Sequence, residues 1–208
     1  MAVPPHRSER NALCDLFTRR GPTAPTLCQG WTTTDLATHL VVRERHPLAA
    51  LGLVLSPFAA TLQKAMDRTS AATSYDRLVA LVRSGPPSPL RPFDAAMNLS
   101  EYFIHHEDVR RGAGDTTPRP TADVADIEEA LWRSLGRGSH RSLGTTGLDL
   151  IHPDGRIAHV RRGNPTATLT GRPGEIVLYL SGRKSAAQVE IGGPPDAVAA
   201  LKDARFGI

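Results

Sequence analysis

Apolar residues recur every three or four positions through the first 136 residues, which is the spacing of amphipathic helices. In the first such stretch, over residues 6–20, Leu13, Leu16 and Phe17 share one helical face, and Gly21-Pro22 predicts its end. Five further helices are expected from similar stripes and capping residues, over residues 33–46, 48–67, 75–84, 93–111 and 122–136. The pattern therefore predicts a bundle of helices in the N-terminal part of the chain.

The periodicity changes after Gly136. Residues 136–147 are rich in glycine and serine and indicate a loop or linker. Two short apolar runs then flank Pro153-Asp154-Gly155, which is typical of a β-hairpin. Two more strands and two helices are expected over residues 166–169, 188–191, 174–183 and 195–204. The sequence thus predicts an α+β chain, with a helical domain over residues 1–140 and a small α+β domain over residues 147–208.

Composition and charge narrow the class of protein. The 208 residues are 40% apolar, which is enough for one large domain or for a domain with a small appendage. Lys and Arg number 25 against 21 Asp and Glu, and no basic block stands out, so no nucleic-acid partner is expected. The two cysteines cannot form a disulfide framework or a four-thiolate zinc site. The longest apolar stretch, residues 48–55, is far shorter than the roughly 20 residues of a membrane-spanning helix, so we expect a cytoplasmic protein without a membrane partner.

Polar residues interrupt the apolar face of the helix expected over residues 93–111. Phe93, Met97 and Ile104 form its apolar stripe, and Glu101 and His105 lie among them. These two polar residues are four positions apart and are therefore neighbours on the helix surface. A carboxylate and an imidazole inside a bundle are costly unless a partner satisfies them. A divalent metal ion is one such partner, and helix-borne Glu and His ligands are a known way to bind it.

A third metal ligand is expected from another helix. His39 lies between Leu36 and Leu40, on or beside the apolar stripe of the second helix. Together with Glu101 and His105 it makes a set of two histidines and one carboxylate, which leaves a coordination position open for water or substrate. The spacing Glu-x-x-x-His also arises by chance in many helices. The alternative interpretation is therefore a group of polar residues that satisfy one another, or a pair on the helix surface.

Other polar residues near the three predicted ligands are expected to support the site or to have no part in it. Asp108 follows His105 by three positions and can orient its ring, or can instead pair with an exposed arginine. His106 is rotated by about 100° from His105 and is expected to face outwards or to lie at a boundary. Cys28 has no basic neighbour in the sequence, and Cys14 lies beside an apolar face, so neither is predicted to be a reactive thiol.

Three stretches resemble the mycothiol-dependent maleylpyruvate isomerase-like family. GPTAPTLCQGWTTTDLATHLVVRERHP (residues 21–47) resembles the start of these proteins, and EYFIHHEDVRR (residues 101–111) resembles the metal-binding helix of their actinobacterial branch, the branch with HHEDVRR. Residues 171–192 resemble their small C-terminal domain. The resemblance implies a DinB-like, up-down four-helix bundle with extra helices, followed by a sterol-carrier-like α+β domain.

The resemblance also implies a cofactor and a cosubstrate. A divalent metal ion, usually zinc, would be held by residues that fall on His39, Glu101 and His105, and mycothiol would be the low-molecular-weight thiol. A thiol activated by the ion could isomerise a small electrophilic substrate or be transferred to it. Arg183 could hold a substrate carboxylate as a catalytic residue, or act only as a cation at a helix end. Arg43, one turn after His39, is predicted to bind the cofactor; it could face an anionic substrate, or merely solvent.

Two other classes of function stay open. One is a metal-binding module without turnover, such as a stress or thiol sensor. The other is the carriage of a small lipid by the C-terminal domain. Thiol consumption in the presence of an electrophile distinguishes the enzyme from the sensor, and a lipid that copurifies with the protein indicates the carrier.

Overall fold

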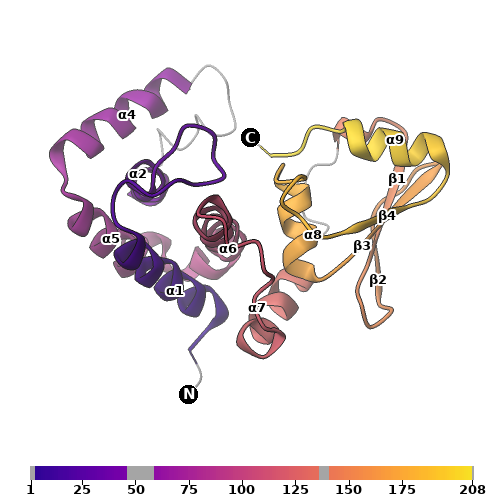
Figure 1. The fold of residues 1–208 in the computed structure, drawn as a ribbon, viewed down its shortest axis with the longest axis horizontal. Coiled ribbons are helices and arrows are strands. Elements are labelled where there is room, and N and C mark those ends of the chain that lie inside the picture. Colours follow the sequence, from indigo (N-terminus) through magenta and orange to yellow (C-terminus); the bar gives the residue numbers. More distant parts are fainter. Residues whose placement is uncertain (1–2, 46–58, 136–140, 208) are drawn as a thin grey trace. The chain divides into compact units, whose positions relative to one another are not determined.

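The structure, a computed structural model, describes residues 3–45, 59–135 and 141–207. It contains two compact units that divide between Pro118 and Arg119 (Figure 1). The α+β class predicted from the sequence is confirmed, because the first unit consists of packed helices and the second contains a four-stranded sheet with helices. Within the described ranges, no helix combines the length and the hydropathy needed to cross a membrane.

Helices make up the first unit. They are α1 (Pro5–Arg20), α2 (Thr33–Arg45), α4 (Ala59–Ala72), α5 (Tyr75–Ser84), the 3-10 helix η3 (Ser88–Phe93) and α6 (Asp94–Gly112). As predicted, α1 ends at Gly21, which has a positive φ of 76° and donates its N–H to the Phe17 carbonyl at 2.9 Å. The first part of the helix expected over residues 48–67 lies outside the described residues.

One hydrophobic core joins four of these helices. Leu13 and Phe17 of α1, Leu36 of α2, Leu78 of α5 and Tyr102 of α6 are all fully buried in it. Because these residues recur at helical spacing, each helix buries one apolar stripe against its neighbours. Within this unit α6 packs along α1, and it also contacts α2 through the polar side chains that form the candidate site.

A small mixed sheet organises the second unit. Its elements are α7 (Thr121–Ser134), the 3-10 helix η4 (Arg141–Leu143), β1 (Gly147–Ile151), β2 (Ile157–Arg161), β3 (Thr166–Thr170), α8 (Pro173–Leu180), β4 (Glu190–Gly192) and α9 (Pro195–Asp203). The strand order is β2-β1-β3-β4, with β1 parallel to β3 and the other pairs antiparallel. The hairpin predicted at residues 153–155 joins β1 to β2, and Gly155 in its turn has a positive φ of 91°.

Helix α7 belongs to the second unit. Arg172 donates its Nε to Glu128 of α7 at 3.1 Å and its Nη1 to the Arg119 carbonyl at 2.8 Å. Trp132 of α7 packs against the core that the sheet forms with α8 and α9. The compact units therefore divide before α7, whereas the sequence places this helix in the N-terminal domain and the domain boundary in residues 136–147.

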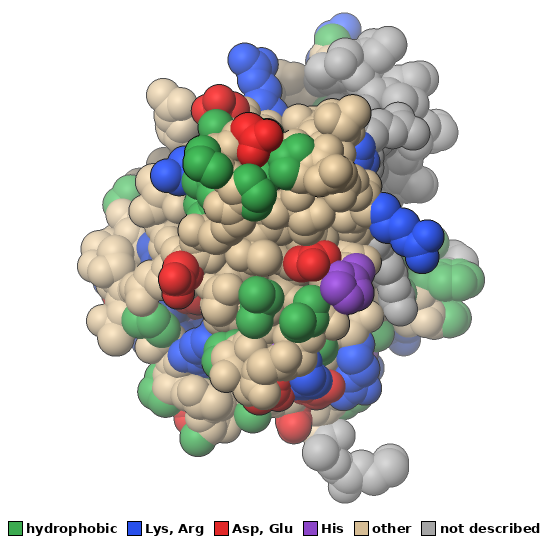
Figure 2. Space-filling view, turned by 90° about the vertical axis from the view of Figure 1, so that its right-hand side faces the viewer, with side chains coloured by type: hydrophobic (Ala, Val, Ile, Leu, Met, Phe, Trp, Pro, Cys, Tyr) green, Lys and Arg blue, Asp and Glu red, His purple; other side chains and the backbone are tan. Residues whose placement is uncertain are grey.

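The charged side chains of the second unit are mixed in sign. On the face that Figure 2 shows, basic and acidic side chains are interspersed with apolar ones. The exposed Arg156 illustrates this mixing, because it pairs with Glu129 at 3.0 Å and with Asp154 at 2.8 Å. Such pairs lower the net charge that a local surface presents.

Candidate metal centre

The structure brings together the three residues predicted as metal ligands. One donor atom from each of His39, Glu101 and His105 lies within 4.8 Å of the other two. His105 Nε2 is 3.5 Å from Glu101 Oε2, and the centroids of the two imidazole rings are 5.2 Å apart. Both histidines are only 6% exposed. Two nitrogens and a carboxylate oxygen at this separation fit a divalent ion with three protein ligands.

Local sequence explains how His39 reaches this position. Asp35 accepts hydrogen bonds from the N–H and the hydroxyl of Thr32, at 2.8 and 2.6 Å, which stabilises the start of α2. From that start, Leu36 and Leu40 fall on the buried face of the helix. His39 lies beside them and packs against the ring of Trp31, with centroids 5.3 Å apart.

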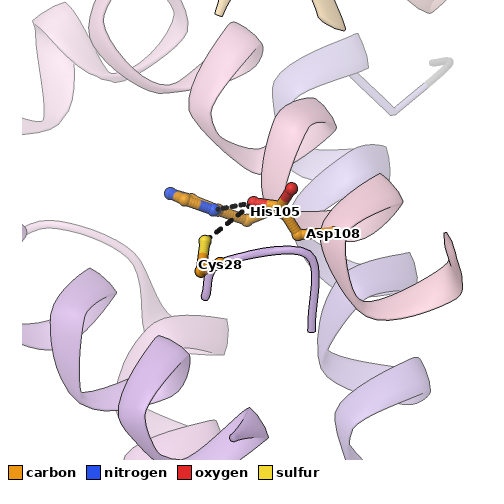
Figure 3. Close-up of side chains that lie close together, drawn as sticks. All are labelled: Cys28, His105 and Asp108. Atoms are coloured by element: carbon orange, nitrogen blue, oxygen red, sulfur yellow. Dashed lines mark hydrogen bonds and ion pairs between the residues drawn. The ribbon is translucent and has the colours of Figure 1, made fainter. Parts of the chain in front are cut away.

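The orientation of His105 is set by a buried carboxylate. Asp108 Oδ2 lies 2.8 Å from His105 Nδ1, and the Asp108 side chain is fully buried. The same oxygen accepts a hydrogen bond from Cys28 Sγ at 3.3 Å (Figure 3). With Nδ1 directed at Asp108, Nε2 is the ring atom that faces Glu101. The structure thus supports the orienting role expected for Asp108.

The charges at the site favour an ionised carboxylate beside a cationic imidazole. Burial alone raises the pKa of Glu101, but the hydrogen bond from His105 and the charges of Arg43 and His39 outweigh it and lower the pKa to about 2. Burial alone lowers the pKa of His105, but its bonds to Asp108, Cys28 and Glu101 raise it well above the usual value. A metal ion at Nε2 must therefore displace a proton, so its affinity falls as the pH falls.

Arg43 is directed at α6. Its Nε lies 3.5 Å from Glu101 Oε2, its Nη2 donates to the Met97 carbonyl at 2.9 Å, and its Nη1 donates to Asn98 Oδ1. These contacts give Arg43 a role that the sequence did not indicate, which is to hold the carboxylate of Glu101 ionised and in place. Contact of Arg43 with the cofactor or with an anionic substrate stays a prediction.

Arg183 lies in the second unit, just beyond α8. Its Nη1 donates to the Ser181 carbonyl at 2.7 Å, and its N–H donates to the Leu178 carbonyl at 2.9 Å. Both acceptors are carbonyls at the C-terminal end of α8, where a cation interacts favourably with the helix dipole. These contacts agree with the role of a helix-end cation. Its contact with a substrate stays a prediction.

The burial of α6 differs from the expectation in two respects. Phe93 and Met97, expected on its buried stripe, are 60% and 44% exposed. His106, expected to face outwards or to lie at a boundary, is 6% exposed, and its Nδ1 lies 2.9 Å from Glu9 Oε1 of α1. The burial of His106 follows from its partner on α1, because Glu9 satisfies the polar ring atom inside the bundle.

A buried polar network beside the site was not visible in the sequence. Arg10 of α1 donates to both carboxylate oxygens of Asp94 at 2.5 Å and to the Tyr102 hydroxyl at 2.9 Å. The Tyr102 hydroxyl in turn donates to Glu44 Oε1. Burial raises the pKa of Glu44, more than the hydrogen bond from Tyr102 lowers it. The partners come from three helices, and no local spacing relates them.

Comparisons with known proteins support the fold. No family model matches this chain, and no curated protein matches it in sequence. A crystal structure of a histidine-to-alanine mutant of the mycothiol-dependent maleylpyruvate isomerase covers 90% of this chain and 90% of that chain, with a TM-score of 0.50 and 16% identity. A second crystal structure, of the mycothiol-dependent maleylpyruvate isomerase, covers 91% and 93%, with a TM-score of 0.47 and 17% identity. The first of these comparisons shows that the chain is similar in fold to this isomerase, as the resemblance of its sequence predicts.

Proposed function

We propose that this chain binds a divalent metal ion, most simply Zn²⁺, at His39, Glu101 and His105. We further propose that it uses the ion to activate a low-molecular-weight thiol, mycothiol, for isomerisation of a small electrophile or for S-transfer to it. The observation that carries the proposal is the convergence of three ligand atoms within 4.8 Å from two helices. The similarity in fold to a thiol-dependent isomerase supports the choice of chemistry.

The donor set suits catalysis better than a purely structural role. Structural zinc sites have four protein ligands, whereas three leave one position open. When bound there, the ion would act as a Lewis acid that lowers the pKa of a thiol or a water molecule in the open position. Glu101 contributes a negative charge that partly neutralises the ion, and Arg43, at 3.5 Å, holds this carboxylate in its ionised form.

The neighbouring residues keep the imidazole ready for an ion. Asp108 accepts the Nδ1 proton of His105 in a hydrogen bond, which leaves Nε2 as the available donor atom. The ring of Trp31 limits the movement of His39. Since both histidines are buried, little reorganisation is needed when an ion enters, and pre-arranged ligands bind with less loss of entropy.

Arg183 is proposed as the residue that holds an anionic substrate. A guanidinium binds a carboxylate through two parallel hydrogen bonds, which fixes the substrate's orientation as well as its charge. Arg183→Lys keeps the charge and loses this geometry. Turnover is therefore expected to fall while the metal content is unchanged. Arg156→Lys, at an exposed arginine of the same unit, is the matched control and should have no effect.

The test is a thiol-consumption assay with the zinc-loaded protein, mycothiol and a panel of small electrophiles. The parent protein should consume thiol, Glu101→Gln should lose both metal and activity, and Arg183→Lys should lose activity alone. If the zinc-loaded parent neither binds mycothiol in calorimetry nor consumes any thiol, the enzyme proposal is wrong and the chain is a metal-binding module without turnover.

A further inference from the structure

The Nδ1 side of His105 presents a second group of potential ligands. Cys28 Sγ, His105 Nδ1 and Asp108 Oδ2 are donor atoms that all lie within 4.8 Å of one another. Figure 3 shows the imidazole with one nitrogen turned towards Asp108 and Cys28 and the other turned away from them. Asp108 contacts Nδ1 of His105, whereas Glu101 lies 3.5 Å from Nε2, so the two groups use different nitrogens of the same ring.

The backbone fixes Cys28 in this position. Cys28 lies in the loop between α1 and α2. The N–H of Leu27, the preceding residue, donates to the Asp108 carbonyl at 3.0 Å, which attaches this loop to α6 at Asp108. The Cys28 N–H donates to Thr26 Oγ1 at 3.2 Å, and the Cys28 carbonyl accepts from the Trp31 N–H at 2.9 Å. These hydrogen bonds hold the Cys28 backbone beside α6, and the thiol reaches Asp108 Oδ2 at 3.3 Å from that position.

Close packing supports the same alignment. A Cβ on Gly112 would lie only 2.4 Å from Thr26 Cα, so the loop can approach α6 this closely only because residue 112 is glycine. Gly112 lies one turn beyond Asp108 on the same helix. Backbone atoms of the loop around Thr26 and of α6 thus contact each other directly. This contact fixes the position of the Cys28 backbone relative to Asp108.

We propose that Cys28, His105 and Asp108 form a second metal site, which is selective for a soft, thiophilic cation such as Cd²⁺. A sulfur ligand distinguishes this donor set from the two nitrogens and one oxygen of the first site, and thiolates prefer softer ions. Asp108 is fully buried and His105 nearly so, while Cys28 is partly exposed.

Binding at the second site exchanges protons for the ion. The Cys28 thiol and His105 Nδ1 each release one proton to solvent, and their bonds to hydrogen are replaced by bonds to the cation. His105 Nε2 then retains its proton and can donate it to Glu101, 3.5 Å away. A single imidazole serves both sites, so occupation of one disfavours occupation of the other unless the ring loses both protons.

The experiment uses Co²⁺ as the probe, because thiolate coordination gives a near-ultraviolet sulfur-to-cobalt charge-transfer band. His39→Ala combined with Glu101→Gln removes two ligands of the first site and none of the second. This double variant should still show the band on saturation with Co²⁺. Adding Cys28→Ser should abolish the band, whereas adding Cys14→Ala should leave it intact. Cys14 is a matched control because it is the other thiol of the chain and lies in the α1–α5 core, where it contacts the Val79 carbonyl.

A measurement on the unaltered chain removes any dependence on how the variants fold. Alkylation of Cys28 by iodoacetamide, followed by mass spectrometry, should slow on addition of Cd²⁺ and should not slow on addition of Mn²⁺, which prefers oxygen ligands. The proposal is overturned if a folded double variant binds Co²⁺ without the band. It is also overturned if Cd²⁺ leaves the alkylation rate unchanged. In both cases Cys28 serves only as a hydrogen-bond donor to Asp108, and the first site is unaffected.

Discussion

Replacing Asp108 with asparagine tests whether the buried carboxylate prepares His105 for a metal ion. The side chains have the same size, so the change removes a charge and leaves the packing. Asp108 is fully buried and accepts from His105 Nδ1 at 2.8 Å. A hydrogen bond to a charged partner contributes about 1.5–3 kcal/mol. Loss of a group that orients a metal-bound histidine typically weakens metal binding about 10–100-fold, or about 1.4–2.7 kcal/mol. The two magnitudes agree, so we expect zinc affinity to fall by about 10–100-fold.

The assay is competition for Zn²⁺ between the protein and a chromophoric chelator at pH 7, with circular dichroism to verify folding. Asp115→Asn is the matched control, because Asp115 lies just beyond α6, is exposed, and pairs with Arg110 at 3.0 Å. It should leave the affinity unchanged. Equal zinc affinity in folded Asp108→Asn and in the parent would refute the reasoning. An equal loss in both variants would instead indicate a general effect of charge.

Three further predictions concern the framework. Burial raises the pKa of Glu44 above its ordinary 4.5, so the folded state binds this proton more tightly than the unfolded state. The parent therefore loses stability as the pH rises above about 4.5 and Glu44 ionises, and Glu44→Gln does not. Urea unfolding at pH 4 and pH 7 should show a larger free energy of unfolding for Glu44→Gln, relative to the parent, at pH 7 than at pH 4. Gly112→Ala should destabilise the protein by about 1–3 kcal/mol, because the new Cβ would lie 2.4 Å from Thr26 Cα; an unchanged melting temperature would contradict this. Limited proteolysis should cut in the exposed residues 114–117 and release a stable C-terminal fragment that includes α7; a stable fragment that begins after residue 140 would instead support the boundary expected from the sequence.

Features that depend on local spacing were accessible from the sequence. The end of α1 at Gly21, the stripe of Leu36 and Leu40 on α2, and the hairpin after β1 follow from helical period and turn chemistry. The Glu101–His105 pair follows in the same way, because residues four apart on a helix are neighbours. Prediction of His39 as their partner needed the additional expectation that a metal would satisfy two polar groups in a core.

Features that depend on distant pairing were not accessible. Cys28 contacts Asp108 across 80 positions, and Arg43 contacts Asn98 across 55. Periodicity identifies which face of a helix is apolar, but it cannot identify polar partners that another helix will supply. His106 shows this directly, because its burial depends on Glu9 of α1. Glu128 of α7 likewise pairs with Arg172, 44 positions away.

The central claim is that His39, Glu101 and His105 hold a divalent ion. Elemental analysis of the purified protein tests it most directly, alongside a His39→Ala, Glu101→Ala, His105→Ala triple variant. The first site should hold close to one zinc or similar divalent ion per chain in the parent and none in the triple variant. If free Zn²⁺ is held at 100 times its dissociation constant, removing it with a chelator should also lower the free energy of unfolding of the parent by about 2.7 kcal/mol. Full metal occupancy in the triple variant, or a metal-free parent after reconstitution with Zn²⁺, would contradict the account.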